Sequence, residues 1–124
     1  MKKKVNAAIL IIGNEILSGR TQDKNIAFLS NWLNTKCGIT VREVRIIPDV
    51  QKTIVDNILL LSKKFNYVFT TGGIGPTHDD ITASSISKAF QRKYEIHKEA
   101  FGILQNYYKP GEFTEGRQKM TWMP

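Results

Sequence analysis

The chain has 124 residues, of which 41% are hydrophobic and 23% are charged. These values are typical of one soluble globular domain, here residues 1–124, and exclude a disordered chain. Its formal net charge of +7 either keeps the surface solvated or attracts anions such as phosphates and nucleotides. The sequence shows no nucleic-acid reader motif and no apolar run of about 20 residues. We therefore expect the chain to bind neither nucleic acid nor a membrane.

The first predicted element is a strand buried on both faces, because Val5 to Ile12 form a largely apolar run. Three lysines, Lys2 to Lys4, precede this run and imitate the start of a secretion signal. The run is short, however, and no small-residue cleavage site follows it. We therefore expect a cytoplasmic protein.

A helix is predicted after the loop Gly13 to Arg20, with Thr21 as its N-cap and Gly38 at its end. Cys37, the only cysteine, cannot form an intramolecular disulfide. We expect it to be a buried or half-buried thiol in a reducing cytoplasm. The apolar residues at helical spacing are expected to lie in the core: Ile26, Leu29 and Leu33.

Two further strands are predicted in the middle of the chain. Ile39 to Ile47 is rich in β-branched residues and ends at Pro48, and Tyr67 to Thr71 forms the next strand. Asp49 is placed to cap the helix between them. That helix carries one apolar stripe: Val50, Ile54, Ile58 and Leu61. The alternation of strands and helices is typical of βαβ units and a parallel sheet.

The last third of the chain is predicted to be mainly helical. We expect helices from about Asp80 to Arg92 and from Lys98 to Tyr108, then a short helical turn near Thr114 to Lys119. Met120 to Pro124 resembles the opening of another strand, so the expected domain is a fragment or its sheet is completed by another chain. Three aromatic residues of this region are expected to be buried, with a place in an interface as the alternative: Tyr107, Tyr108 and Trp122.

A glycine-rich loop lies between the third strand and the following helix, and residues 71–80 read Thr-Gly-Gly-Ile-Gly-Pro-Thr-His-Asp-Asp. Glycines let backbone N–H groups approach phosphate oxygens, and a helix N-terminus adds a positive partial charge. Ligands of open parallel sheets collect at the carboxyl ends of the strands. The loop matches neither the dinucleotide fingerprint nor the P-loop. A tight turn without a ligand is the alternative explanation.

Acidic residues surround this loop. Asp79 and Asp80 would be favoured by the helix dipole alone, but beside a phosphate they make better sense if a divalent cation such as Mg²⁺ bridges them to the ligand. His78 is a ligand, an acid–base group or a solvated bystander. Asp49 projects from the same edge of the sheet, where helix capping explains it equally well.

The loop after the first strand, Gly13 to Arg20, leaves that strand at the same edge. It offers backbone donors, the Ser18 hydroxyl and the Arg20 guanidinium, whose shape suits phosphate. The glycines of this loop, Gly13 and Gly19, are alternatively simple turn residues. Asn25, in the following helix, either reaches the cleft or lies on the surface.

These segments together resemble the molybdopterin-binding (MoaB/Mog-type) domain family, and most of all the N-terminal domain of the competence/damage-inducible CinA proteins. Four segments carry the resemblance in order: residues 13–19, Asp23 with Asn25, Pro48–Asp49, and residues 71–83. The resemblance covers essentially the whole chain. It implies a three-layer αβα fold with a mainly parallel sheet.

The resemblance also implies a function. Molybdenum-cofactor members of the family bind the phosphate of a pterin at the Gly-Gly loop, with acids matching Asp49 and Asp80. The CinA branch is associated with metal-dependent hydrolysis of nucleotide diphosphates such as ADP-ribose, and the order Pro76 to Asp80 favours that branch. We therefore expect an ADP-ribose-type pyrophosphatase, with a molybdopterin-binding protein of cofactor biosynthesis and a non-catalytic truncated binding domain as the alternatives.

The resemblance assigns roles to individual residues. The expected catalytic acids are Asp49, Asp79 and Asp80, of which Asp79 and Asp80 also hold Mg²⁺ or another divalent metal. The expected phosphate-binding residues are Thr71, Gly72, Gly73, Gly75, Thr77 and Ser18. The expected substrate-binding residues are Gly13, Asn14, Glu15, Asn25 and Thr82.

Two departures from the family accompany these expectations. Asn14 stands where many relatives carry an acid, which weakens an expected metal contact. The family domain also continues beyond the strand that begins at Met120. Relatives are dimers or trimers, so we expect a homo-oligomer that binds a nucleotide or pterin phosphate.

Overall fold

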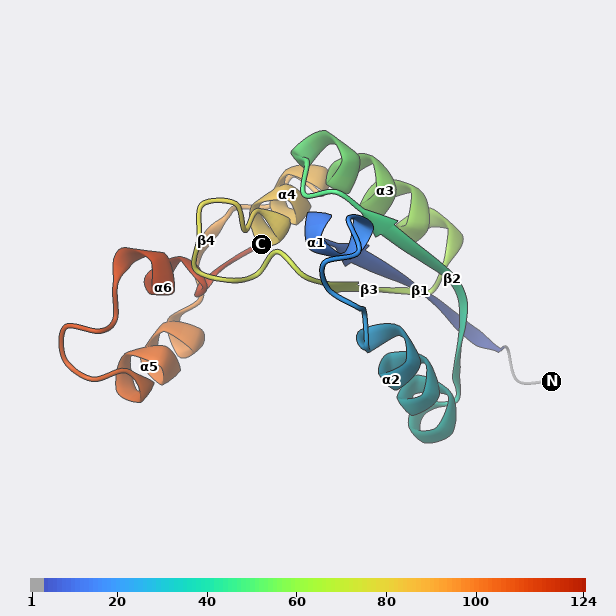
Figure 1. The fold of residues 1–124 in the computed structure, drawn as a ribbon, viewed down its shortest axis with the longest axis horizontal. Coiled ribbons are helices and arrows are strands. Elements are labelled where there is room, and N and C mark those ends of the chain that lie inside the picture. The colour runs from blue at the N-terminus through green and yellow to red at the C-terminus, as the bar shows by residue number, and fades with distance from the viewer. Residues whose placement is uncertain (1–3) are drawn as a thin grey trace.

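The computed structural model describes residues 4–124, and Lys2 and Lys3 of the N-terminal lysine run lie outside the described residues. An α/β body is formed by the first two thirds of the chain, and a smaller lobe by the last third (Figure 1). None of the helices in residues 4–124 combines the length and the apolar character needed to span a membrane.

The body is built on a three-stranded parallel sheet in the order β2-β1-β3. The central strand β1 (Val5–Ile12) lies between β2 (Ile39–Ile47) and β3 (Tyr67–Thr71). Residues 7–12 of β1 are at most 2% exposed, which confirms the strand buried on both faces. Asn6 and Asn66 exchange hydrogen bonds of 3.0 Å between amide and side chain, and so fasten the start of β3 to β1.

Helices cover the two faces of this sheet (Figure 1). α3 (Gln51–Lys64) buries Ile54, Ile58 and Leu61 against β1, together with α4 (Thr82–Ala89). α2 (Asn25–Trp32) and a π-helical turn, η1 (Leu33–Cys37), lie on the other face. The three-layer αβα arrangement and the parallel sheet are thereby confirmed. Val50, the first residue of the predicted α3 stripe, is 49% exposed and lies outside the core.

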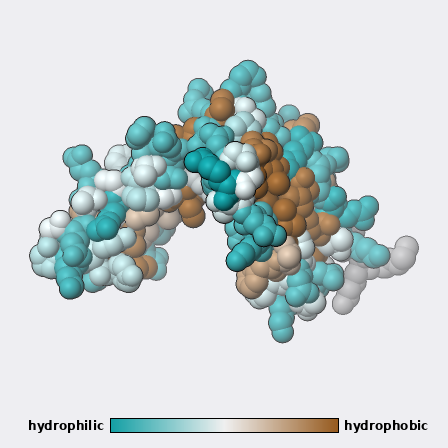
Figure 2. Space-filling model, in the orientation of Figure 1, coloured by the Kyte–Doolittle hydropathy of each residue, from teal (hydrophilic) through white to brown (hydrophobic). Residues whose placement is uncertain are grey.

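The face beneath α2 is more thinly covered than expected. Leu33 is buried, but Ile26 and Leu29 are only half-buried, so the predicted core stripe is partly wrong. Figure 2 shows the resulting hydrophobic band over β2, where Val44 and Ile46 are 36% and 37% exposed. Helices with a low apolar contrast between their faces cover a sheet incompletely.

The ends of α2 and η1 differ in part from the prediction. Gly38 ends η1 with a φ of 67°, as predicted. Thr21 does not cap the helix, because α2 begins at Asn25 and the Asp23 carboxylate accepts the Ile26 amide instead, at 2.9 Å. Cys37 is exposed rather than buried, because it lies on the outer side of η1, whose single buried residue is Leu33.

The lobe contains β4 (Glu95–Ile96), α5 (Lys98–Tyr107), α6 (Glu115–Lys119) and β5 (Trp122–Met123). A strand does open near Met120, as predicted, but it pairs antiparallel with β4 and does not extend the parallel sheet. Within the described residues, β4 and β5 thus form a sheet of their own.

Aromatic rings hold the lobe together. Phe113 packs against Phe101 and Tyr108, with ring centroids 5.1 and 5.9 Å apart. The expected burial of the aromatic residues is wrong for Tyr107, which is 77% exposed, and for Trp122, which is 37% exposed. Tyr107 instead meets the edge of Tyr108 on the lobe surface.

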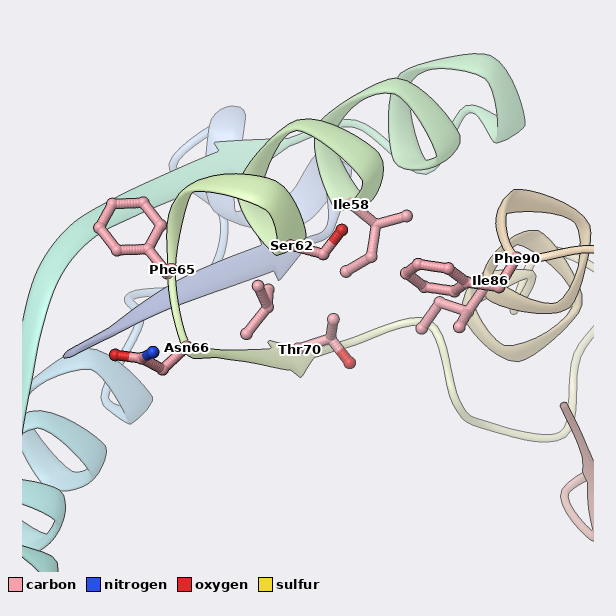
Figure 3. A pocket seen from close by; sticks show the side chains of 8 residues that line it. Ile58, Ser62, Phe65, Asn66, Thr70, Ile86 and Phe90 are labelled. Carbon is pink, nitrogen blue, oxygen red and sulfur yellow. The ribbon is translucent and has the colours of Figure 1, made fainter. Parts of the chain in front are cut away.

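An apolar groove lies between α3, α4 and the free edge of β3 (Figure 3). Ile58, Phe65, Val68, Ile86 and Phe90 line it, with Ser62, Asn66 and Thr70 as its polar members. It contains no acidic side chain and no residue of the glycine loop. The groove therefore lacks the groups that the sequence predicts for the functional site.

Candidate functional site

The glycine loop, residues 72–80, follows β3 at the carboxyl edge of the sheet. Gly72 and Gly73 have φ angles of 87° and 66°, a backbone conformation that residues with a side chain adopt only with strain. A Cβ atom at Gly72 would collide with the Ile12 carbonyl oxygen, and one at Gly73 with the Thr82 hydroxyl. Glycine is therefore required at both positions by backbone conformation and by space.

Thr82 holds this loop by two hydrogen bonds. Its hydroxyl donates to the Gly72 carbonyl oxygen at 2.8 Å, and its amide donates to the Gly73 carbonyl oxygen at 3.1 Å. Thr82 is 1% exposed. The hydroxyl and the amide of Thr82, a predicted substrate-binding residue, are thus both engaged by the loop.

Asp80 ties the far side of the loop. One carboxylate oxygen accepts the amide and the hydroxyl of Thr77, at 2.9 and 2.8 Å. Partial burial tends to raise the pKa of Asp80, but hydrogen bonds from the Thr77 and Gly75 amides and the charge of Lys119 outweigh it and lower the pKa below its ordinary value. The ionised carboxylate therefore fixes the shape of the loop.

Lys119, at the end of α6 in the lobe, binds the glycine loop. The sequence does not indicate this role. Its ammonium donates to the carbonyl oxygens of Thr77 and Asp80, at 2.5 and 2.6 Å. A lysine in the last turn of a short helix is explained by the helix dipole alone. Only the return of the chain across 39 residues brings it to Asp80.

Asp79 and His78 point away from these contacts. Their side chains are 74% and 94% exposed, and His78 Nε2 lies 3.3 Å from an Asp79 carboxylate oxygen. Asp79 and Asp80 both precede α4, which begins at Thr82; their predicted position in the first turn of a helix is therefore wrong. Residues 75–79 form bends and a turn instead, which hydrogen bonds between Thr77 and Asp80 hold in place.

These residues do not fit a resident divalent metal. Within residues 4–124, no group of three or more His, Cys, Asp or Glu side chains is close enough to hold an ion. The Asp80 carboxylate already serves the loop, and an ammonium group stands beside it.

The other predicted residues lie at the ends of the neighbouring strands. The Gly13 amide donates to the Ile47 carbonyl oxygen at 3.0 Å and joins β1 to β2. A short helix, α1 (Asn14–Leu17), replaces the first part of the expected loop. Asp49 is half-buried and does not cap α3, whose N-cap is Val50 without a side-chain hydrogen bond.

The polar side chains of this second segment are largely exposed. Ser18 donates to the Glu15 carbonyl oxygen and accepts from Arg20, both at 3.3 Å. Asn14 and Asn25 are exposed. No hydrogen bond in the described chain joins this segment or Asp49 to the glycine loop, although parallel strands bring all of them to one edge of the sheet.

A hollow of about 230 Å³ lies between the glycine loop and the lobe. Gly73, Ile74, Gly75, Asp80 and Ala83 line it from the loop and the start of α4, and Tyr94, Lys119, Met120, Trp122 and Met123 line it from the lobe. The amides of Gly73 and Ile74 donate to no other described residue. The first-turn amide of Ala83 has no partner inside α4 by helix geometry. The hollow therefore offers N–H groups and one ammonium to an anion.

Comparison with known proteins identifies relatives along almost the whole chain. Residues 8–123 match the family described as a probable molybdopterin binding domain. A protein of Archaeoglobus fulgidus is 40% identical over 104 residues, which are 84% of this chain and 45% of that protein. A Pyrococcus abyssi protein is 35% identical and matches 97% of this chain and 51% of its own length. The chain thus spans about half the length of these curated relatives.

Solved structures give the same result. The structure of CinA from Thermoplasma acidophilum, a protein of unknown function, has a TM-score of 0.88 at 32% identity, covering 98% of this chain and 72% of the other. The molybdopterin biosynthesis enzyme MoaB from Thermus thermophilus shares the fold, with a TM-score of 0.66 at 16% identity over 87% of this chain and 67% of the other. This chain therefore belongs to the molybdopterin-binding domain family and is similar to CinA.

Proposed function

We propose that this domain binds a small phosphorylated heterocycle, a pterin phosphate of the molybdopterin type or a nucleotide, with the phosphate on the glycine loop. The observation that carries this proposal is the frame around the loop. Thr82 and Lys119 donate to carbonyl oxygens of the loop, and the Asp80 carboxylate accepts the Thr77 amide, so that the turn is fixed. The Gly73 and Ile74 amides are left without a partner in the described chain.

Most of the charge at the site suits an anionic ligand. Lys119 and the N-terminus of α4 provide positive charge or partial charge at the hollow. The Asp80 carboxylate also lines the hollow, but one of its oxygens is neutralised in part by the Thr77 amide and hydroxyl that it accepts. Backbone amides in a glycine turn at a helix N-terminus are a known physical solution for phosphate. Within this proposal Thr71, Gly72, Gly73, Gly75 and Thr77 shape the phosphate site.

The segment after β1 supplies a second set of contacts for a longer ligand. It lies at the same edge of the sheet, across the end of β1. We assign it the part of the ligand remote from the loop phosphate. The residues proposed for these contacts are Gly13, Asn14, Glu15, Ser18, Asn25 and Asp49.

A ligand screen tests the proposal. The purified chain is titrated calorimetrically with molybdopterin, AMP, ADP-ribose and inorganic pyrophosphate, and its thermal midpoint is measured with each. A ligand that binds only the native state raises the midpoint by mass action. Lys119→Met should weaken each phosphorylated ligand, whereas Lys52→Met, on an exposed face of α3, should not. Unchanged midpoints with all four compounds would refute the proposal.

Hydrolysis of a nucleotide diphosphate is the second candidate, supported by the similarity to CinA. Because the described residues do not fit a resident metal, a cation would arrive with the phosphates of the substrate. The assay follows release of AMP from ADP-ribose with and without Mg²⁺. Release that disappears in Asp80→Asn and persists in Asp79→Asn supports hydrolysis by this site. Tight binding of ADP-ribose without release of AMP would contradict hydrolysis and support only the binding function.

Self-association is a separate part of the proposal. The hydrophobic band over β2, which includes Val44 and Ile46, supports a homo-oligomer of the kind that the family resemblance implies. Light scattering during gel filtration measures its mass. Ile46→Lys should shift an oligomer to the monomer, and a monomeric wild-type chain would rule out this part.

A further inference from the structure

We propose that Tyr94 and Trp122 form an aromatic shelf on which the planar ring of the phosphorylated ligand stacks; this inference rests on the proposed function. Both residues line the hollow that contains Gly73 and Asp80. Neither belongs to the glycine loop, and neither is among the site residues predicted from the sequence. The ligand class is a phosphorylated compound with a flat heteroaromatic ring.

The hollow has two chemically different sides. The loop and the start of α4 present amides, and Lys119 presents an ammonium, whereas the facing wall of the lobe presents Tyr94, Met120 and Trp122. The polar surface suits an anion, and the aromatic surface suits a neutral flat ring. A ligand with both groups would therefore use the whole hollow.

The two rings are arranged as a tilted pair rather than a closed stack. Their centroids are 5.4 Å apart and their planes meet at 47°. Trp122 remains 37% exposed in spite of this contact, so part of its surface is available to a further ring. Base–aromatic stacking contributes substantially to binding and tolerates different bases, because every base has a π-face.

Backbone contacts hold the shelf in place. The neighbouring Thr121 is fully buried, and its hydroxyl donates to the Gln118 carbonyl oxygen at 2.6 Å. Its carbonyl oxygen accepts the His97 amide at 2.7 Å. The Tyr94 ring packs on Trp122 from the segment that enters β4. The shelf is thus set before a ligand arrives, which reduces the entropy lost on binding.

The same turn carries Lys119 and Trp122, three positions apart. Lys119 reaches the carbonyl oxygens of the loop, while Trp122 lies on the apolar side of the hollow. One short segment therefore sets the spacing between the phosphate and the ring.

Calorimetric titrations of the full chain with ADP, FMN and inorganic pyrophosphate test the shelf. Trp122→Ala and Tyr94→Ala should weaken ADP and FMN at least about fivefold and leave pyrophosphate unchanged. Trp122→Phe should restore most of the affinity. Trp32→Ala and Tyr107→Ala are matched controls, because these exposed aromatics lie on α2 and α5, outside the hollow.

A second readout does not depend on the folding of the alanine variants. In Trp32→Phe protein, Trp122 is the only tryptophan, and its fluorescence lifetime should shorten with ADP and FMN but not with pyrophosphate. Binding of ADP and FMN with an unchanged Trp122 lifetime would overturn the shelf and leave the proposed function intact. Absence of calorimetric binding for all three compounds would overturn both.

Discussion

Lys119 places its ammonium 2.6 Å from the backbone carbonyl oxygen of Asp80, and the two residues are 39 positions apart in the chain. This contact joins the lobe to the glycine loop. The Thr77 carbonyl oxygen accepts a second hydrogen bond from the same ammonium. The shape of the loop therefore depends on a residue outside it.

Replacing Lys119 by Met tests that dependence. Met keeps most of the apolar stem but leaves the Thr77 and Asp80 carbonyl oxygens without their charged donor. We expect the free energy of unfolding to fall by about 1–2 kcal/mol, because bonds from a charged donor are stronger than neutral ones and these are partly exposed. Urea denaturation measures this, with Lys52→Met as control. Equal stability of the two variants would contradict the role of Lys119.

Asp80 should make the stability depend on pH. Its pKa is lowered in the folded state, so the stability that its ionised form provides is complete above its ordinary pKa and is lost as the pH falls through the lower, folded-state value. Wild type should therefore exceed Asp80→Asn by more at about pH 6 than at about pH 3. Denaturation at both pH values measures this difference. A difference that is constant with pH would show that the charge is irrelevant.

Gly73→Ala should distort the loop more than a glycine substitution with backbone strain alone. A Cβ at Gly73 meets the Thr82 hydroxyl, whereas one at Gly111 has nothing within 4 Å, and both glycines have positive φ angles. We expect losses of about 2–4 kcal/mol at Gly73 and about 1 kcal/mol at Gly111. Chemical denaturation of the two variants separates collision from strain. Equal losses would mean that Thr82 yields without cost.

Ser85 offers a substitution that should stabilise the fold. Its hydroxyl is buried on α4 and has no hydrogen-bond partner among the described residues. Ser85→Ala removes an unpaired polar group and should raise the unfolding free energy by about 0.5–1 kcal/mol. Ser87→Ala is the matched control, because the Ser87 hydroxyl donates to the Ala83 carbonyl oxygen. A loss of stability in Ser85→Ala would indicate a partner for this hydroxyl.

The body of the fold could be predicted because its signals are local. The apolar run of β1 and the stripe Ile54, Ile58 and Leu61 of α3 each follow from a pattern within one element. Gly38 ended η1 for the same reason. The pairing of β5 with β4 could not be predicted, since strands of two residues meet through turns whose geometry depends on tertiary packing.

The site was predictable only in its backbone. The glycines at 72 and 73 follow from the loop pattern and adopt positive φ angles. The direction of the two acidic side chains could not be predicted, because nothing in the sequence distinguishes one of two adjacent aspartates from the other. In the structure Asp80 turns inward to Thr77, and Asp79 turns to solvent. Lys119, Tyr94 and Trp122 were missed, since no short motif connects them to the loop.

β4 and β5 pair over only two residues each, whereas β1 is fixed between two partners. Regions with so few ladder bonds open at a much lower free energy than the core. A compound seated between the lobe and the loop would therefore leave when the lobe frays, without any unfolding of the sheet. Its residence time would follow the amide-exchange rates of the last few residues, which the bound compound would slow in turn.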